Sequence, residues 1–295
     1  MKIDVLAIGE LLADFISNDY TNSLANAHEF TMFQGGSPAN LCANLKFLGK
    51  NAELVATVGN DNIGAFLIQS LQKIGLGSTY IHQIHGIPTS LVLVGKSLNT
   101  PDFIAYRMAD TYIEHISETL LMHAQIVHTS AFALSKNPAQ QHILQALNIA
   151  KSLGNQVSCD WNFAPEIWSP SNGQNIFEKL CALHPLLKLS LDDFKRFTKN
   201  DEATAEQAIN YLSQFHTTLT CLTCGSEGVW YTDHEKGWHK QDAKPVSVVD
   251  ATGAGDAFWA GFLAEFTHSN NIHSSVSNGI NLAAQKIQQL GPLYL

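Results

Sequence analysis

The amino-acid sequence predicts a three-layer α/β/α fold on a mainly parallel central β-sheet, with a second, smaller β-sheet inserted into it. Short runs of β-branched and apolar residues alternate with amphipathic helical stretches along most of the 295 residues. Repetition of strand, helix and strand produces parallel strands with helices packed on the sheet. Two stretches, 11–33 and 90–106, break this alternation with further strand-like runs.

The predicted strands of the main sheet are short and mostly apolar. They cover Val5 to Ile8, Leu54 to Val58, Ile126 to Thr129, Val157 to Asp160, Leu186 to Ser190 and Leu219 to Thr223. The predicted helices, with apolar residues three and four apart, are Pro38 to Leu48, Ile63 to Ile74, Ala139 to Leu153 and Ala203 to Phe215. Ser37 before Pro38 is a helix-start signal, because serine caps the first amides and proline fits the first turn.

The two interruptions predict strands that leave the main sheet. Leu91 to Val94 and Phe103 to Tyr106 flank the turn-like segment Asn99-Thr100-Pro101-Asp102, which predicts a hairpin. We expect these strands to form a lid, at about 11–33 and 87–110, inserted in one domain that spans 1–295. The edges of such a sheet invite pairing with a second copy, so a homodimer through the lid is compatible with the sequence.

Composition limits the partners and the compartment. Acidic residues outnumber basic ones 26 to 17, which disfavours nucleic acid or an anionic membrane as partner. No apolar run approaches membrane-spanning length, and the first residues read as a strand rather than an export signal. Five cysteines, an odd number in a chain of this size, suit reduced thiols. We expect a cytoplasmic protein that acts on small molecules.

The most informative segment is the small-residue turn Asp250-Ala251-Thr252-Gly253-Ala254-Gly255-Asp256, which runs into an apolar helix. Its glycines allow the backbone to approach a ligand, and the helix start offers unpaired amides at the positive end of the dipole. Such a turn attracts phosphate. We expect Asp256 to stay ionised there and to take a proton from a hydroxyl beside the phosphate. The alternative is a plain strand-to-helix turn with a first-turn acid.

A second glycine pair opens a helix at Gln34-Gly35-Gly36-Ser37-Pro38-Ala39-Asn40, which alone fits a plain capped turn equally well. Together, the two segments resemble the two signatures of the PfkB-type, ribokinase-like carbohydrate kinases. The resemblance covers nearly the whole chain. It continues in order through Gly9-Glu10 with Asp14, Asp160-Trp161-Asn162, Ser190-Leu191-Asp192-Asp193 and Thr223-Cys224-Gly225-Ser226-Glu227-Gly228.

What this resemblance implies is ATP-dependent phosphorylation of a sugar hydroxyl, in a cleft between a large α/β/α domain and a small β lid. Asp256 matches the catalytic base of the family. The amides of Ala254, Gly255 and their neighbours match the anion hole that stabilises the moving phosphoryl group, and Gly253 provides the turn.

The same resemblance assigns substrate-binding residues. Asp14, Gly35, Gly36 and Asn40 fall where family members hold sugar hydroxyls. Arg107 and Asp110, at the end of the second lid strand, look like the fructokinase pattern. An arginine in this place would pair with the sugar or the transferred phosphate, and the alternative is an exposed strand-end charge.

Nucleotide and cation sites are also implied. Thr223, Gly225 and Gly228 match the nucleotide-binding strand and turn, and Asn281 lies near where the family packs adenine. Mg²⁺ is expected beside the ATP phosphates, with Asp193 matching the glutamate of the family's Asn-x-x-Glu motif and Ser190 replacing its asparagine. Asp250 and Thr252 match positions that border a monovalent-cation site, for K⁺, in many members.

The identity of the sugar substrate is the part of the function that the sequence determines least. Asp160 and Asn162 match a substrate pattern, Asp-x-Asn-x-Arg, of fructokinases and keto-deoxy-sugar-acid kinases, but Ala164 replaces its arginine. Without this arginine the chain lacks a bidentate partner for a substrate carboxylate, which favours a neutral sugar. The preferred substrate is therefore fructose, phosphorylated to fructose 6-phosphate. The alternatives are a kinase for 2-keto-3-deoxygluconate, ribose or a nucleoside, and a non-catalytic binding homologue. A dehydrogenase is disfavoured because no G-x-G-x-x-G follows the first strand.

Overall fold

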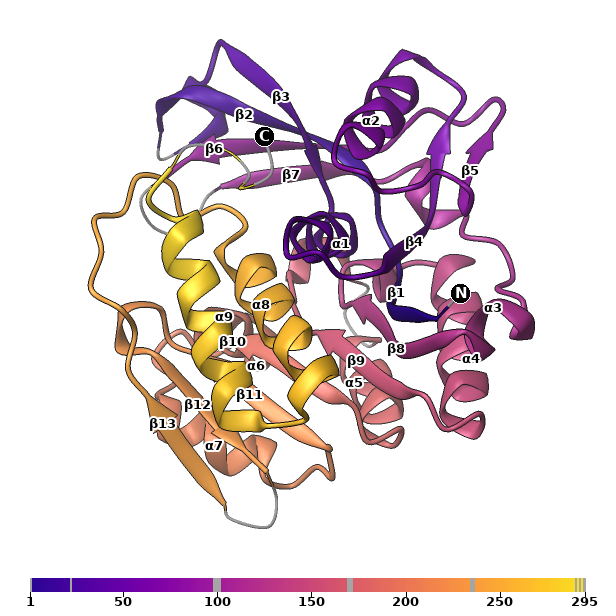
Figure 1. Cartoon of the computed structure of the whole chain (residues 1–295). Helices are drawn as coiled ribbons and strands as arrows, with labels where there is room; N and C mark the ends of the chain where they lie inside the picture. Colours follow the sequence, from indigo (N-terminus) through magenta and orange to yellow (C-terminus); the bar gives the residue numbers. More distant parts are fainter. Residues whose placement is uncertain are drawn as a thin grey trace.

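The main sheet forms the middle layer of the molecule. The computed structural model describes residues 2–21, 23–97, 102–168, 172–233, 237–289, 291 and 293. Within these ranges nine strands pair in the order β13-β12-β11-β10-β9-β8-β1-β4-β5 (Figure 1). They are β1 (Ile3–Ile8), β4 (Ala52–Gly59), β5 (Ile81–Ile84), β8 (Ala124–Ser130), β9 (Gln156–Asp160), β10 (Leu186–Ser190), β11 (Leu219–Thr223), β12 (Val229–Thr232) and β13 (Trp238–Gln241). The pairs β11–β12 and β12–β13 are antiparallel and the others are parallel.

Helices cover both faces of this sheet, which explains why its central strands are apolar throughout. In β1, Val5, Leu6, Ala7 and Ile8 are fully buried. One face packs on α1 (Ser37–Phe47), α2 (Asn62–Lys73), α8 (Ala254–Ser269) and α9 (Ile272–Lys286). The other packs on α3 (Glu118–Met122), α4 (Ala139–Ser152), α5 (Gly173–Cys181), α6 (Leu191–Thr198) and α7 (Ala205–Leu212). The predicted three-layer fold is therefore confirmed.

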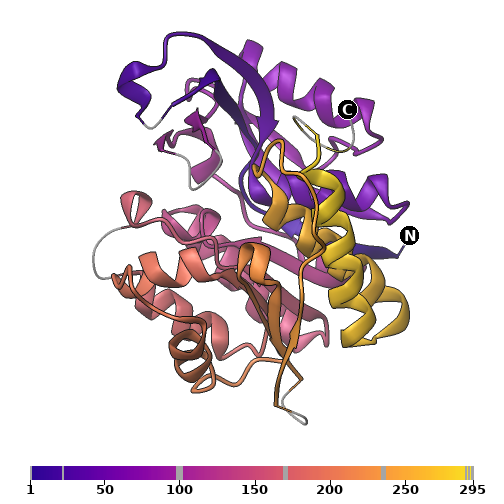
Figure 2. The same cartoon turned by 90° about the vertical axis from the view of Figure 1, so that its left-hand side faces the viewer.

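The smaller sheet consists of β3 (Phe30–Gly35), β2 (Leu12–Tyr20), β6 (Leu91–Lys96) and β7 (Phe103–Tyr106), in that order. It lies over one end of the main layers (Figures 1 and 2). The predicted departure of both segments from the main sheet and the β6–β7 antiparallel pair are confirmed. β2 and β6 pair in parallel, so the sheet is mixed. Asn99, Thr100 and Pro101 of the predicted turn lie outside the described residues.

All six predicted strands and four predicted helices of the main layers are present, with bounds shifted by a few residues. The sequence reading did not predict β5, β12, β13, α3, α5 or α6. It was also wrong about the cap of α1. Gly36, at φ 100°, holds the cap position, and Ser37 is the first helical residue. A Cβ at Gly36 would lie 2.3 Å from the Glu10 carbonyl oxygen, so the backbone there requires glycine.

The carboxyl ends of the parallel strands meet at one edge of the sheet, where ligands bind in open α/β folds. Glu10 follows β1, Ser130 ends β8, Asp160 ends β9, Ser190 ends β10 and Thr223 ends β11. The short 3₁₀ turns of the described chain are Leu24–Asn26, Ala109–Thr111, Ala133–Ser135, Pro165–Ile167 and Gly225–Glu227. No described helix combines the length and the apolarity needed to cross a membrane.

Candidate active site

The site is organised around the start of α8. Gly253 precedes the helix in the left-handed conformation, at φ 75°, and Ala254 begins it. The Ala257 amide makes the first intrahelical bond, to the Gly253 carbonyl. By helix geometry the amides of Gly255 and Asp256 therefore have no acceptor inside the helix. The Ala254 amide, which the sequence placed in the anion hole, instead donates to the Ala251 carbonyl at 3.1 Å. Two donors and the positive end of a 16-residue helix are thus available to an anion.

The Asp256 carboxylate, in this first turn, is oriented by α1. Ser37 Oγ donates to Asp256 Oδ1 at 2.7 Å, and Asn40 Nδ2 donates to Oδ2 at 2.9 Å. Burial raises the pKa of Asp256, while these two hydrogen bonds and the charges of Lys188 and Lys286 lower it, and burial prevails. Burial thus outweighs the local donors in setting this pKa, while the ionised state of Asp256 and its role as a base stay predictions.

Asp14 on β2 faces Asp256 from the small sheet. Its carboxylate has no hydrogen bond or ion pair among the described residues, and burial together with the charge of Asp256 raises its pKa to about 7. A Cβ at Gly35 would lie 2.1 Å from Asp14 Oδ2, so glycine is needed for the two strands to bring the carboxylate here. The Asp14 carboxylate therefore lies near that of Asp256, and Asp14 also lines the pocket described next.

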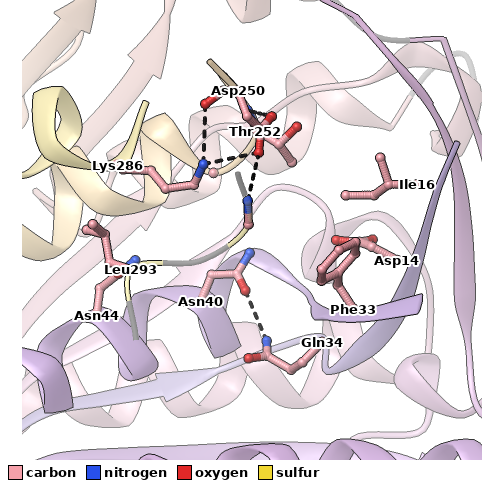
Figure 3. A pocket seen from close by; sticks show the side chains of 12 residues that line it. Asp14, Ile16, Phe33, Gln34, Asn40, Asn44, Asp250, Thr252, Lys286 and Leu293 are labelled. Carbon is pink, nitrogen blue, oxygen red and sulfur yellow. Dashed lines mark hydrogen bonds and ion pairs between the residues drawn. The ribbon is translucent and has the colours of Figure 1, made fainter. Parts of the chain in front are cut away.

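This pocket has an empty volume of about 460 Å³, which includes space open to solvent. Figure 3 shows the side chains around it. Polar and apolar groups from β2, β3, α1, the loop before α8 and the end of α9 line it: Asp14, Ile16, Phe33, Gln34, Asn40, Asn44, Asp250, Thr252, Gly253, Lys286, Gly291 and Leu293. An adjoining pocket of about 480 Å³ extends between the small sheet and Asp250, with Lys96 in its lining.

Glu10 supports the turn that carries Ser37. Its carboxylate is buried and accepts from the Ser37 amide at 3.0 Å and from Ser130 Oγ at 2.7 Å. Burial raises the pKa of Glu10 to about 8, against the lowering effect of the Ser130 hydrogen bond. The sequence motif pointed to Glu10 without giving it a role, and the structure shows that it anchors the start of α1.

A buried lysine lies beneath the α8 tip. Lys188 Nζ lies 2.9 and 2.8 Å from the two carboxylate oxygens of Asp160, and a Cβ at Gly255 would lie 2.7 Å from it. The charges of Asp160 and Asp193 raise the pKa of Lys188 against the effect of burial, which favours the ammonium form. The sequence reading missed Lys188, although a lysine inside the apolar run Leu186-Leu187-Lys188-Leu189 is a signal of a paired buried charge.

Four of the predicted substrate-binding residues are bonded to other protein groups outside this pocket. Asp160 is paired with Lys188, and Asn162 Oδ1 accepts from the Phe132 amide at 3.1 Å. Arg107 is buried, not an exposed strand-end charge, and pairs with Asp110 at 2.5 Å. Its guanidinium also donates to Ser135 Oγ and to the Phe132 carbonyl and covers the Phe132 ring at 4.0 Å. None of these four lines the pocket beside Asp14.

The predicted nucleotide residues lie at the end of β11, in the turn after it, and on α9. Thr223 ends β11, and Gly225 and Gly228 bound the 3₁₀ turn that follows it. Gly228 has φ 93°, and a Cβ there would lie 2.2 Å from the Gln241 carbonyl oxygen. Asn281 lies on α9, half-buried.

Predicted cation ligands are partly engaged by the protein. Asp193 accepts from the Ser190 amide and hydroxyl and from Arg196, which occupy three of about four acceptor positions of a carboxylate. Asp250 accepts from the Thr252 amide at 3.0 Å and forms an ion pair with Lys286 at 3.3 Å. The described residues contain no group of three or more His, Cys, Asp or Glu side chains placed to hold a metal.

Comparisons with known proteins show the family and the fold. The model of the pfkB family of carbohydrate kinases matches residues 2–294. The chain is 34% identical to an ATP-dependent 6-phosphofructokinase of Thermoanaerobacterium thermosaccharolyticum, over 99% of this chain and 90% of that protein. Among solved structures, Halothermothrix orenii fructokinase is similar with a TM-score of 0.82 and 31% identity, over 94% of this chain and 98% of that one.

A second structure carries bound ligands. It is a fructokinase double mutant from Vibrio cholerae O395 with fructose, ADP and a potassium ion bound. Its TM-score is 0.83 at 22% identity, over 99% of this chain and 94% of that one, which shows a shared fold.

Proposed function

The chain belongs to the pfkB family of carbohydrate kinases, and from that premise we propose that it transfers the γ-phosphoryl group of ATP to a primary hydroxyl of fructose, giving fructose 6-phosphate. The observation that carries the proposal is the Asp256 carboxylate at the tip of α8, held by Ser37 and Asn40 next to the Asp14 pocket. A base, an anion-binding helix tip and a polar pocket are the three parts that phosphorylation of an alcohol needs.

Asp256 acts as the general base in this proposal. Its two α1 donors fix the carboxylate, and each oxygen keeps a lone pair for an incoming hydroxyl. Because burial raises the pKa of Asp256 toward the working range, the ionised group is a stronger base than an exposed aspartate. As the sugar oxygen forms a bond to the γ-phosphorus, its proton passes to the Asp256 carboxylate. The bond between the γ-phosphorus and the β-phosphate oxygen breaks, and ADP departs.

The turn 253–255 acts as the anion hole. The amides of Gly255 and Asp256 point along the helix dipole, so they stabilise negative charge on the transferred phosphoryl group without moving. The Lys188 ammonium lies below Gly255, and its ion pair with Asp160 offsets part of its charge. Thr223, Gly225, Gly228 and Asn281 would bind the nucleotide on the far side of this turn.

The pocket chemistry favours a neutral sugar. Asp14 and the amide side chains of Asn40 and Gln34 suit hydroxyl groups, and Ile16 and Phe33 suit the apolar face of a sugar. Lys286, a cation in the pocket lining, is already paired with Asp250. Ala164 replaces the arginine that would bind a sugar acid. These features disfavour 2-keto-3-deoxygluconate.

Fructose 6-phosphate is a second candidate substrate. The relative from Thermoanaerobacterium thermosaccharolyticum is named for that activity, and Lys96 lines the adjoining pocket. Lys96 contacts the Tyr20 ring and the Asn18 carbonyl, so a phosphate there would have to displace these contacts. Ribose and nucleosides remain lesser candidates.

Magnesium fits this site as an ion brought by the nucleotide. The one acceptor position left on Asp193 would hold an Mg²⁺-bound water, and bound Mg²⁺ would neutralise charge on the β- and γ-phosphates. The small sheet, at about 11–33 and 87–110, would act as a lid that excludes water. A homodimer through this sheet and a cytoplasmic location stay predictions.

The experiment is a coupled ADP-release assay on a panel of fructose, fructose 6-phosphate, 2-keto-3-deoxygluconate, ribose and adenosine. We expect fructose to give the highest kcat/KM. A preference for fructose 6-phosphate would select the second candidate. Turnover of none of the five would remove the proposed activity.

A further inference from the structure

Lys286 places a buried ammonium group beside the loop that leads into α8. Its side chain is 6% exposed, and Nζ lies 3.3 Å from both the carbonyl oxygen and Oδ2 of Asp250, whose side chain is 9% exposed. Figure 3 shows both contacts at the edge of the pocket. One cation therefore binds a backbone and a carboxylate oxygen of the same residue.

These two oxygens are hard ligands of the kind that a monovalent cation takes. The family resemblance implies that Asp250 and Thr252 border such a site, and the fructokinase from Vibrio cholerae O395 has a potassium ion bound. In this chain the donor set does not fit an added cation, because a positive charge near Asp250 would lie within a few ångströms of Nζ and be repelled. An ammonium group and K⁺ are of similar size.

We propose that the Lys286 ammonium takes the place of a monovalent cation at the loop 250–253, so that the kinase works without K⁺. Lys286 is then a positioning residue for the anion hole. Its place in the last turn of α9 suits a cation, since the helix dipole is negative there.

The loop contacts show what the ammonium positions. Asp250 Oδ1 accepts from the Thr252 amide, and the Val249 and Asp250 amides donate to the Ile287 carbonyl. Burial raises the pKa of Asp250, but the hydrogen bonds from Thr252 and the charge of Lys286 outweigh burial and bring this pKa below its ordinary value. The loop is thus fastened to the end of α9 by one ion pair and two backbone bonds, immediately before Gly253.

The alternative role of Lys286 is direct contact with a ligand phosphate, as it lines the pocket. The two roles differ in what an added ion can restore. A small cation can replace an ammonium that holds a loop. It cannot reproduce a side chain that reaches a phosphate, so rescue by K⁺ separates the roles.

The first arm of the test uses the unmodified protein. Activity is measured with the best sugar of the panel in tetramethylammonium buffer, and K⁺ is then added to 100 mM, a concentration at the order of physiological ionic strength. We expect kcat/KM to change less than twofold. Activation of tenfold or more by K⁺ would overturn the proposal.

The second arm replaces the lysine. We expect Lys286→Ala to lose at least tenfold in kcat in tetramethylammonium buffer and to recover most of it with K⁺ or NH₄⁺. Lys73→Met is the matched control, since Lys73 also ends a helix, α2, but is exposed. Its activity should stay unchanged and independent of ions. Full activity of Lys286→Ala without added cation, or a loss that no cation restores, would contradict the proposed role.

The third arm measures binding of a monovalent cation rather than activity, because the first two arms rest on the proposed function. Crystals of the unmodified protein and of Lys286→Ala are soaked in thallium(I), whose anomalous signal reports monovalent-cation sites. We expect a peak at Asp250 only in the variant. A peak there in the unmodified protein would refute the replacement, whether or not the protein phosphorylates fructose. If Lys286→Ala does not fold, the unmodified protein alone decides.

Discussion

Ser37, the first residue of α1, donates a hydrogen bond of 2.7 Å to Asp256 in the first turn of α8, although 219 residues separate them in the chain. Asn40, one turn further along α1, donates to the other oxygen of the same carboxylate. Two glycine-containing segments that each open a helix are thereby joined at one carboxylate. The base proposed for the reaction is oriented by α1 as much as by its own helix.

Replacement of the base is the first prediction. Asp256→Asn keeps the shape of the side chain and removes its ability to take a proton. We expect kcat to fall by about 10³-fold or more, with little change in ATP affinity measured by calorimetry. Unchanged turnover would dismiss the general-base role, and equal loss of ATP affinity would indicate a disturbed helix tip instead.

The second prediction concerns Ser37. Its hydrogen bond lowers the pKa of Asp256, so Ser37→Ala should raise that pKa further. The base works when deprotonated, and we therefore expect the acidic limb of the kcat/KM profile to move to higher pH by about half a unit to one unit. Ser152→Ala, at an exposed serine of α4, is the control. An acidic limb that stays in place would show that Ser37 does not tune the base.

Asp14 supplies a prediction about stability. The unfolded chain ionises this group near pH 4, whereas its pKa in the folded protein is about 7, so the folded state holds a proton that the unfolded state has lost. Stability from this group is present at low pH and falls as pH rises from about 4 to 7. We expect Asp14→Asn to raise the free energy of unfolding at pH 8, measured by urea titration, by about 1 to 2 kcal/mol after allowance for solvent screening. At pH 4 we expect no gain.

The same variant should bind sugar poorly. Loss of a carboxylate that takes hydrogen bonds from hydroxyl groups should raise the KM for the sugar at least about tenfold with a smaller effect on ATP, as expected for a charged hydrogen bond. A stabilised variant that keeps its sugar KM would place the sugar elsewhere in the pocket.

Arg107 and Asp110 lead to a fourth prediction. Both side chains are buried and paired, so Arg107→Met should cost about 3 to 5 kcal/mol of unfolding free energy, because it leaves the Asp110 charge unpaired. We expect the double variant Arg107→Met with Asp110→Leu to recover part of this loss. A stable single variant that has lost only sugar or phosphate affinity would instead support the substrate contact that the fructokinase pattern implies.

The sequence was sufficient for the parts of the fold that depend on local periodicity. The apolar run of β1 and the three- and four-residue spacing of α4 were readable because burial on a sheet imposes those patterns. The parallel pairing of β2 with β6 was not readable, since it depends on a long connection. The cap of α1 was misread because the need for glycine at Gly36 comes from the distant Glu10 carbonyl.

The chemistry of the site was harder to predict, because charge states and partners depend on contacts between distant segments. The glycine turns indicated where Asp256 would lie. They could not show that burial raises its pKa, that Lys188 pairs with Asp160, or that Lys286 pairs with Asp250. Arg107 was expected to reach toward a ligand, and the Asp110 carboxylate that it pairs with lies in the turn just after it.

The central claim is that a sugar hydroxyl, the γ-phosphorus and the Asp256 carboxylate meet at the tip of α8. A crystal structure with fructose and a nonhydrolysable ATP analogue tests it most directly. The account predicts a primary hydroxyl within hydrogen-bond distance of Asp256, about 2.6 to 3.2 Å, and the γ-phosphate on the amides of Gly255 and Asp256. A carboxylate turned away from the hydroxyl, or a γ-phosphate bound away from those amides, would contradict it.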